Sequence, residues 1–376
     1  MPTARGKGGF ISKGIDPVQA PDAPTIGAVT VASGTSLSVA FTAPSDTGGA
    51  AIDSYAVIAY DSSGNAFSAT GSSSPITVSG LTTGTEYTCQ VQAINVFGSS
   101  QYSGTATGTP AVQGQEAYTS AGTYSFTAPT GVTSVSVVAV GGGGGSGGTQ
   151  SGSTAGDGGG GPGLRYGNNI SVTAGNSYTV VVGDVGVNGA IYTHGQNGGD
   201  SSFNGTDVVA GGGFGTGAGR NGNGGSGSLG SGISGGGGDG GQGSPQSNGF
   251  GGGGGGAAGY SGNGGNGAAY GATAQSGSGG GGGGGTSNSG GNAYGLSGGG
   301  VGIYGQGTNG AGGTSASRTG GSGSINIGDG VGYGRSGTSP GTGSYAGPAY
   351  GGKAGAVRII WPGSSRQFPS TGTTDV

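Results

Sequence analysis

The sequence predicts an all-β protein in which a β-sandwich is followed by a β base that carries a bundle of glycine-rich segments. Short segments of alternating apolar residues, with turn residues between them, fill residues 24–110. Apolar, strand-like segments stand on both sides of a glycine-rich stretch at 190–352. Glycine makes up 109 of the 376 residues and only 6% of residues are charged, so we do not expect one large conventional core.

The chain is expected to begin with an extended arm at residues 1–21, which glycines and prolines interrupt. An arm of this kind is either disordered or docked on a partner. Its candidate docking residues are the apolar Phe10, Ile11 and Ile15. Its basic residues are interpreted either as a solvated tail or as a contact with an acidic partner surface; they are Arg5, Lys7 and Lys13.

Residues 22–110 are expected to form the sandwich. The segment SLSVAFTAP places Leu37, Val39 and Phe41 on one face, and SYAVIAYD, SPITVSGL and EYTCQVQAIN continue the alternation. Strands with a period of two residues at this spacing are typical of an all-β sandwich.

The segment GLTTGTEYTCQVQAINVFGSS, residues 80–100, resembles the fibronectin type III pattern: Gly-Leu, a tyrosine six residues after the leucine, Val-x-Ala-x-Asn and Gly-Ser. The resemblance implies that Tyr87 forms a corner whose hydroxyl hydrogen-bonds back to the chain, with Leu81 packed beneath it. Phe41 replaces a tryptophan of the family. Such domains usually act as spacers or binding units. Cys89 is interpreted as a buried small apolar residue.

A glycine-rich domain is expected at 111–363, followed by a tail at 364–376. Its predicted strands are Val132–Val140, the two sides of a turn at Gly175 within Ile170–Val182, and Ala356–Trp361. Because AVRIIWP is an apolar strand, it should pair with the strands that precede the glycine-rich stretch. These segments would then clamp both ends of that stretch in one base.

The glycine-rich stretch itself is predicted to be an ordered polyglycine II-type bundle. In that form the chain has three residues per turn, and its outward-pointing backbone groups bond to neighbouring chains. A flexible linker is the alternative. Recurring aromatic residues and the returning strand favour order. The strict Gly-X-Y repeat of collagen is absent.

The flanking text YTSAGTYSFTAPTGVTSVSVVAVGGGGG and GAVRIIWP resembles the glycine-rich domain of bacteriophage tail-fibre and adhesin proteins. The resemblance implies a non-enzymatic virion protein that is made in the host cytoplasm and recognises a host glycan or outer-membrane protein. The arm would dock on other virion proteins. Two other functions stay open: a capsid decoration or head fibre without receptor, and a bacterial surface adhesin or ice-binding protein. A homotrimer and a single chain are both possible assembly states.

Aromatic side chains at loop tips suit sugar rings and protein surfaces. The candidate receptor-binding residues are Tyr260, Tyr270, Tyr294 and Tyr304. The alternative is that these tyrosines pack on the flank of the bundle.

Composition and motifs favour no enzyme, cofactor or metal. Matches to GxGxxG arise by chance at this glycine content, and GGKAG at Lys353 lacks the hydroxyl residue of a phosphate-binding loop. The single histidine, His194, is interpreted as a polar loop residue. Nothing predicts nucleic-acid binding or membrane insertion. Calcium binding between loops has no supporting ligand spacing; the scattered candidates are Asp184, Asp200, Asp207, Asp239 and Asp329.

Overall fold

We analysed a computed structural model of the chain. The residues it describes are 18–148, 156–190, 193–216, 222–245, 251–269, 272–279, 281–285, 297–313, 333–334, 336 and 352–370. The chain divides into two compact units, an N-terminal unit at Met1–Val112 and a C-terminal unit at Gln113–Val376. The predicted all-β class is confirmed, since the described residues form antiparallel sheets and contain no helix.

The N-terminal unit is a sandwich of two antiparallel sheets. One sheet has the strand order β1 (Thr25–Ser33), β2 (Ser36–Thr42) and β5 (Ile76–Ser79). The other has the order β4 (Ala66–Gly71), β3 (Ser54–Tyr60), β6 (Tyr87–Asn95) and β7 (Gly98–Ser99), with β8 (Ala106–Gly108) also pairing with β6.

The core of this sandwich follows the predicted alternation. Leu37 and Val39 are fully buried, and Phe41 packs on Tyr55 with ring centroids 4.6 Å apart. The Tyr87 hydroxyl accepts a hydrogen bond from the Thr82 amide at 3.0 Å, which is the expected corner. Leu81 lies in the same buried cluster as Tyr87. Cys89 is buried as well, and its burial raises the pKa of the thiol to about 11.

The C-terminal unit contains two five-stranded antiparallel sheets. The first has the order β10 (Gly122–Thr127), β13 (Ser177–Val182), β14 (Ser201–Phe203), β15 (Val208–Ala210) and β16 (Gly227–Leu229). The second has the order β17 (Ser234–Gly236), β12 (Leu164–Ser171), β11 (Ser134–Val140), β18 (Ala356–Trp361) and β9 (Gly114–Tyr118).

The returning strand pairs as predicted, because β18 lies antiparallel to β11 from Ser136↔Ile360 to Val140↔Ala356. The predicted single base needs one correction. The strands on either side of Gly175 belong to different sheets: β12 pairs with β11, and β13 pairs with β10. The turn at Gly175, which has φ of +83°, carries the chain from one sheet to the other.

Side chains alternate between the two faces of a strand. In β18 the residues on both faces are buried, except for the half-buried Trp361 at its end. On one face Trp361 packs on Phe126 of the first sheet, with ring centroids 5.4 Å apart. On the opposite face Ile360 joins a buried cluster with Ala257 and Val301 from the glycine-rich segments. This strand therefore lies between the first sheet and the glycine-rich segments.

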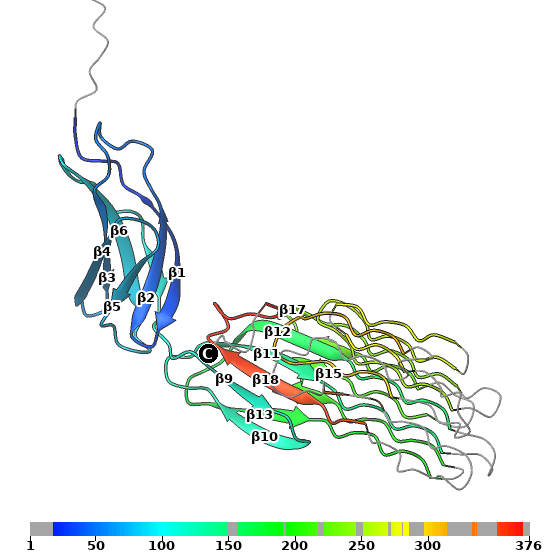
Figure 1. Ribbon diagram of the computed structural model, residues 1–376. Helices are drawn as coiled ribbons and strands as arrows, with labels where there is room; N and C mark the ends of the chain where they lie inside the picture. The colour runs from blue at the N-terminus through cyan, green and yellow to red at the C-terminus, as the bar shows by residue number, and fades with distance from the viewer. Residues whose placement is uncertain are drawn as a thin grey trace, which may run out of the picture. The chain divides into compact units, whose positions relative to one another are not determined.

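We call the described segments between β11 and β18 that lie outside the named strands the glycine-rich block. In Figure 1 these segments run side by side away from the sheets, as green, yellow and orange traces. They are joined to one another by backbone hydrogen bonds across large sequence separations, such as Gly142 to Gly199 and Gly241 to Gly256. Both ends of the block are held by the second sheet, through β11 and β18.

Candidate functional site

Reactive side chains are dispersed in the structure. Among the described residues, no three His, Cys, Asp or Glu side chains come close enough together to hold a metal ion. His194 is exposed. Four of the scattered aspartates accept hydrogen bonds within the fold: Asp184 from the Val185 amide, Asp200 from the Gly212 amide, Asp207 from the Asn204 side chain and Asp239 from Arg165. Asp329 lies outside the described residues.

The glycine-rich block has a regular backbone hydrogen-bond pattern. Three successive amides point to three different neighbours: Gly141 to the Gly163 carbonyl, Gly142 to Gly199 and Gly143 to Lys353. The pattern then repeats, because Gly144 donates to Gly160 and Gly145 to Gln196, each three residues further along. The hydrogen bonds of this segment therefore have a period of three residues.

Neighbouring backbones in the block lie too close for side chains. A Cβ built on Gly142 would lie 1.9 Å from the Asp184 carbonyl oxygen, and one on Gly145 would lie 2.2 Å from that of Val187. Both distances are far below any allowed contact, and the obstacle is backbone rather than a movable side chain. Glycine is thus required at these positions because of the close approach.

Polar side chains continue the three-residue period at the edges of the block. The Asn263 and Asn266 side-chain oxygens accept from the amides of Asp239 and Gln242, at 2.9 and 2.8 Å. Asp200 and Asn197 in the same way accept from Gly212 and Gly215, at 2.8 and 2.9 Å. These side chains bond to backbone amides of neighbouring segments and so hold adjacent segments in register.

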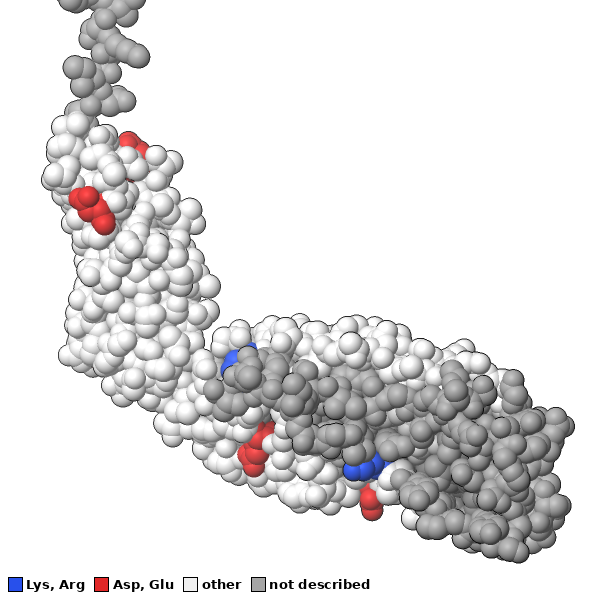
Figure 2. All heavy atoms as spheres, viewed as in Figure 1, with Lys and Arg blue, Asp and Glu red and all other residues white. Residues whose placement is uncertain are grey.

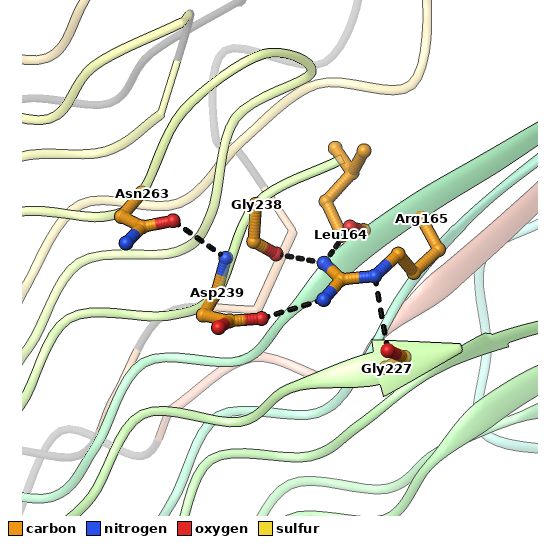
Figure 3. A network of polar contacts seen from close by, with 6 residues as sticks. All are labelled: Leu164, Arg165, Gly227, Gly238, Asp239 and Asn263. Atoms are coloured by element: carbon orange, nitrogen blue, oxygen red, sulfur yellow. Dashed lines mark hydrogen bonds and ion pairs between the residues drawn. The ribbon is translucent and has the colours of Figure 1, made fainter. Parts of the chain in front are cut away.

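Arg165 joins strand β12 to the block (Figure 3). Its guanidinium donates to the carbonyls of Gly227, Leu164 and Gly238, and it pairs with the Asp239 carboxylate at 2.6 Å. The Asp239 amide in turn donates to Asn263. The Arg165 side chain thereby links β12 to β16 and to one segment of the block, at Gly238 and Asp239.

A second group of side chains also joins the second sheet to the block. We call it the aromatic seam, and it consists of Tyr260, Tyr304 and Arg358. Tyr260 is fully buried, and its hydroxyl accepts from the Gly305 amide at 3.1 Å. Burial raises the pKa of Tyr260. The fully buried Arg358 of β18 donates to Gln115 and to the Ile303 carbonyl, and its guanidinium lies 4.4 Å from the centre of the Tyr304 ring.

These positions correct part of the predicted receptor site. Tyr260 is not at an exposed tip; it follows the alternative interpretation and packs inside the domain. Tyr304 is half-buried against Arg358. Tyr270 and Tyr294, as well as the predicted docking residues Phe10, Ile11 and Ile15, lie outside the described residues. Of the two described candidate tyrosines, neither is placed at an exposed tip.

Charged side chains are sparse among the described residues of the surface. Figure 2 shows only isolated charged groups on the described part of the face in view. Large apolar side chains are exposed at two positions of the C-terminal unit's described residues, Val187 at 62% and Phe214 at 47%. Sequence reasoning does not single out this pair as a site. Asp184, Val187 and Ala190 are spaced three residues apart and are all exposed, and this spacing is a signal by which Val187 could have been predicted to be exposed.

Among the described residues there is no apolar helix long enough to cross a bilayer.

Comparison with known proteins identifies the N-terminal unit. The family model of the fibronectin type III domain matches residues 22–109, so this part of the chain is a fibronectin type III domain. A search of curated proteins found no match to the chain.

Solved structures also match part of the chain. The sixth fibronectin type III domain of human fibronectin type III domain containing protein 3 is 26% identical over 26% of this chain and 92% of its own length, with a TM-score of 0.22. The FN5 domain of Drosophila Lar is 21% identical over 24% and 98%, with a TM-score of 0.21. Titin kinase with its flanking domains is 27% identical over 24% of this chain, with a TM-score of 0.22, and the match spans 17% of that structure.

Proposed function

We propose that the chain is a non-enzymatic structural protein of a bacteriophage particle, a tail-fibre or adhesin component that presents a rigid glycine-rich block to the host surface. The resemblance of the segments flanking the block to phage glycine-rich domains supports this assignment. In this arrangement the N-terminal arm docks on other virion proteins, the fibronectin type III domain acts as a spacer, and the block contacts a host glycan or outer-membrane protein.

The block is proposed to have the polyglycine II conformation. A chain with three residues per turn directs successive amides to three sides, where neighbouring chains accept them. The period of three in the bonds of Gly141 to Gly145 supports this form. Backbone ordering costs about 1–2 kcal/mol per residue, and glycine has the most freedom to lose. Dense pairing of backbone groups, together with clamping by β11 and β18, would offset this cost.

The observation that carries the proposal is a block whose amides are paired backbone to backbone in three directions. Such a block is stiff without a large apolar core. Because its backbone groups hold it together, the side chains on its surface can vary without loss of the fold. These are properties that a receptor-facing particle component needs. Chemistry on a substrate would instead need a cluster of reactive groups in a cleft.

Two measurements on the phage that encodes the chain test this function. Antibodies raised against the purified full chain should label intact particles in electron micrographs. The purified chain should also reduce attachment of those particles to host cells in a dose-dependent way. Particles that are never labelled would contradict a virion role.

A capsid decoration or head-fibre protein without receptor is the second candidate. The burial of Tyr260 favours it, because one of the predicted receptor contacts is used for packing. Labelled particles whose attachment is unaffected by the purified chain would support this candidate over the adhesin.

A further inference from the structure

The outer layer of the glycine-rich block consists of the segments 183–190, 193–200, 211–216 and 222–226. On its inner side it bonds to buried segments: Gly186 donates to the Gly143 carbonyl, and Gly225 donates to that of Gly161. Residues 141–148 and 156–163 are buried throughout. The exposed side chains of the outer layer therefore point away from the block, into solvent.

Hydrogen bonds fix which residues of this layer stand side by side. Gln196 donates from its amide to the Val187 carbonyl at 2.8 Å. The Gly215 amide donates to the Asn197 side-chain oxygen at 2.9 Å. Finally, Phe214 donates from its amide to the Asn223 carbonyl at 3.0 Å. These bonds pair Val187 with Gln196, Asn197 with Gly215, and Phe214 with Asn223. We call the outer row the four exposed residues, one from each segment, that lie at a bonded position or next to one: Val187, Asn197, Phe214 and Asn223.

The outer row alternates apolar and amide side chains. Val187 and Phe214 are the two exposed large apolar residues among those described in the C-terminal unit, and both fall in this row. The Asn197 oxygen is already held by the Gly215 amide, which fixes the side chain and leaves its NH₂ group to donate outward. Two exposed large apolar side chains on segments separated by one other, with amide side chains between and beside them, mark a candidate binding surface.

We propose that the outer row binds a neutral glycan chain, laid across the four segments. The faces of pyranose rings are apolar and their edges carry hydroxyls, so a glycan can place ring faces on Phe214 and Val187 and hydroxyls on the asparagine amides. A protein partner would instead favour one contiguous apolar centre with a polar rim. This inference names the partner class of the host-surface role and in that respect rests on the proposed function.

Charge selects neutral glycans over acidic ones. The charged residues of the outer layer's described segments are Asp184 and Asp200, and these segments contain no lysine or arginine. A carboxylated or phosphorylated glycan would meet the negative field of these aspartates, and no lysine or arginine of the described segments would balance it. An uncharged chain of hexoses avoids this repulsion.

Binding of the full chain to a printed array of neutral and acidic bacterial surface oligosaccharides tests the proposal. We expect binding to one or more neutral members, and calorimetric titration with the bound oligosaccharide then gives its affinity. Phe214→Ser should weaken that affinity at least tenfold. Asn197→Asp keeps the oxygen that accepts from Gly215 but removes the outward donor, and should weaken binding several-fold.

Phe97→Ser is the matched control, because Phe97 is 47% exposed, as Phe214 is, but lies in the fibronectin type III domain. It should leave the affinity unchanged, and all three variants should unfold at the temperature of the unmodified chain. Binding to acidic glycans alone, no glycan binding, or equal affinity in all variants would overturn the proposal. A chain that blocks phage attachment but binds no neutral glycan loses this inference and keeps the proposed function. If the chain binds neutral glycans through Phe214 but does not block phage attachment, this inference is kept and the proposed receptor-binding function is lost.

Discussion

The fibronectin type III domain and the glycine-rich block are held together by different contacts, side chains in the domain and backbone groups in the block. The fibronectin type III domain has a core of alternating side chains, with Leu37, Val57 and Val91 fully buried. The glycine-rich block has few side chains to bury, and its segments meet through their backbones. In the fibronectin type III domain the hydrophobic effect selects the fold, whereas in the glycine-rich block the absence of Cβ atoms permits it. The consequence is that adding a methyl group to a glycine should have opposite effects in the domain and in the block.

The sharpest way to break this comparison is a glycine-to-alanine pair. Gly160 lies in the middle of the block, where a Cβ would be 1.9 Å from the Asn223 carbonyl oxygen. We expect Gly160→Ala to lower the free energy of unfolding of the C-terminal unit by about 3 kcal/mol or more, because neighbouring backbones must separate. The chain's single tryptophan, Trp361 in β18, reports this transition by fluorescence in a urea titration.

Gly104→Ala is the control, since a Cβ there meets nothing within 4 Å. Alanine at such an open site reduces the freedom of the unfolded chain, so it should be neutral or stabilise by about 0.5 kcal/mol. A Gly160→Ala variant as stable as Gly104→Ala would show that close backbone packing does not hold the block together.

The second prediction concerns pH and acts on the sandwich. Burial raises the pKa of Cys89 from 9.0 to about 11. The folded state therefore holds the thiol proton more tightly than the unfolded state does. Its contribution to stability is complete below pH 9 and is lost as the pH rises through 11. A shift of this size corresponds to about 2–3 kcal/mol.

Cys89→Ala removes the ionisable group and supplies the reference. The unfolding free energies of the fibronectin type III domain in the two proteins, measured by calorimetry from about pH 8 to about pH 11, should converge as the pH rises. A difference that stays constant over this range would contradict the predicted ionisation.

How far the sequence predicts each unit follows from the same contrast. Alternation at Leu37, Val39 and Phe41 is enough by itself to identify a strand and its buried face. The tyrosine corner is implied by the resemblance to the fibronectin type III pattern, and the hydrogen bond from the Thr82 amide to the Tyr87 hydroxyl confirms it. The pairing of the returning strand β18 is also predictable, because a strand of apolar residues is buried when it pairs with other strands.

The glycine-rich domain is predictable in outline only. Strand β13 of the first sheet is predicted, but β14, β15 and β16 are not, because each is three residues long and lies within glycine-rich text. The surface position predicted for Tyr260 is wrong because a glycine segment has no alternation to mark inside from outside. Whether a residue of the block is buried or exposed depends on which neighbouring segments its backbone bonds to, and those segments are distant in sequence.

Two tyrosine hydroxyls allow a matched test in the two units. Tyr87 accepts from the Thr82 amide in the sandwich, and Tyr260 accepts from the Gly305 amide at the seam. Tyr→Phe at either position leaves a backbone donor unpaired, so each should cost about 1–2 kcal/mol. We expect Tyr87→Phe to lower only the transition of the sandwich and Tyr260→Phe only the transition reported by Trp361. If Tyr260→Phe changed neither transition, the seam would not be part of the cooperative unit of the block.

The smallest expected effect lies at the edge of the block. The Asn266 side chain accepts from the Gln242 amide at 2.8 Å in an exposed contact, so water can replace it. Asn266→Ala should therefore cost only about 0.5 kcal/mol by urea titration, although it removes one link of the same three-residue pattern. Amide exchange at Gln242 should become faster, while exchange at the buried Gly241 amide, which bonds the Gly256 carbonyl, stays slow. Faster exchange at both amides would mean that side chains at the edge, and not the backbone contacts within, keep the segments in register.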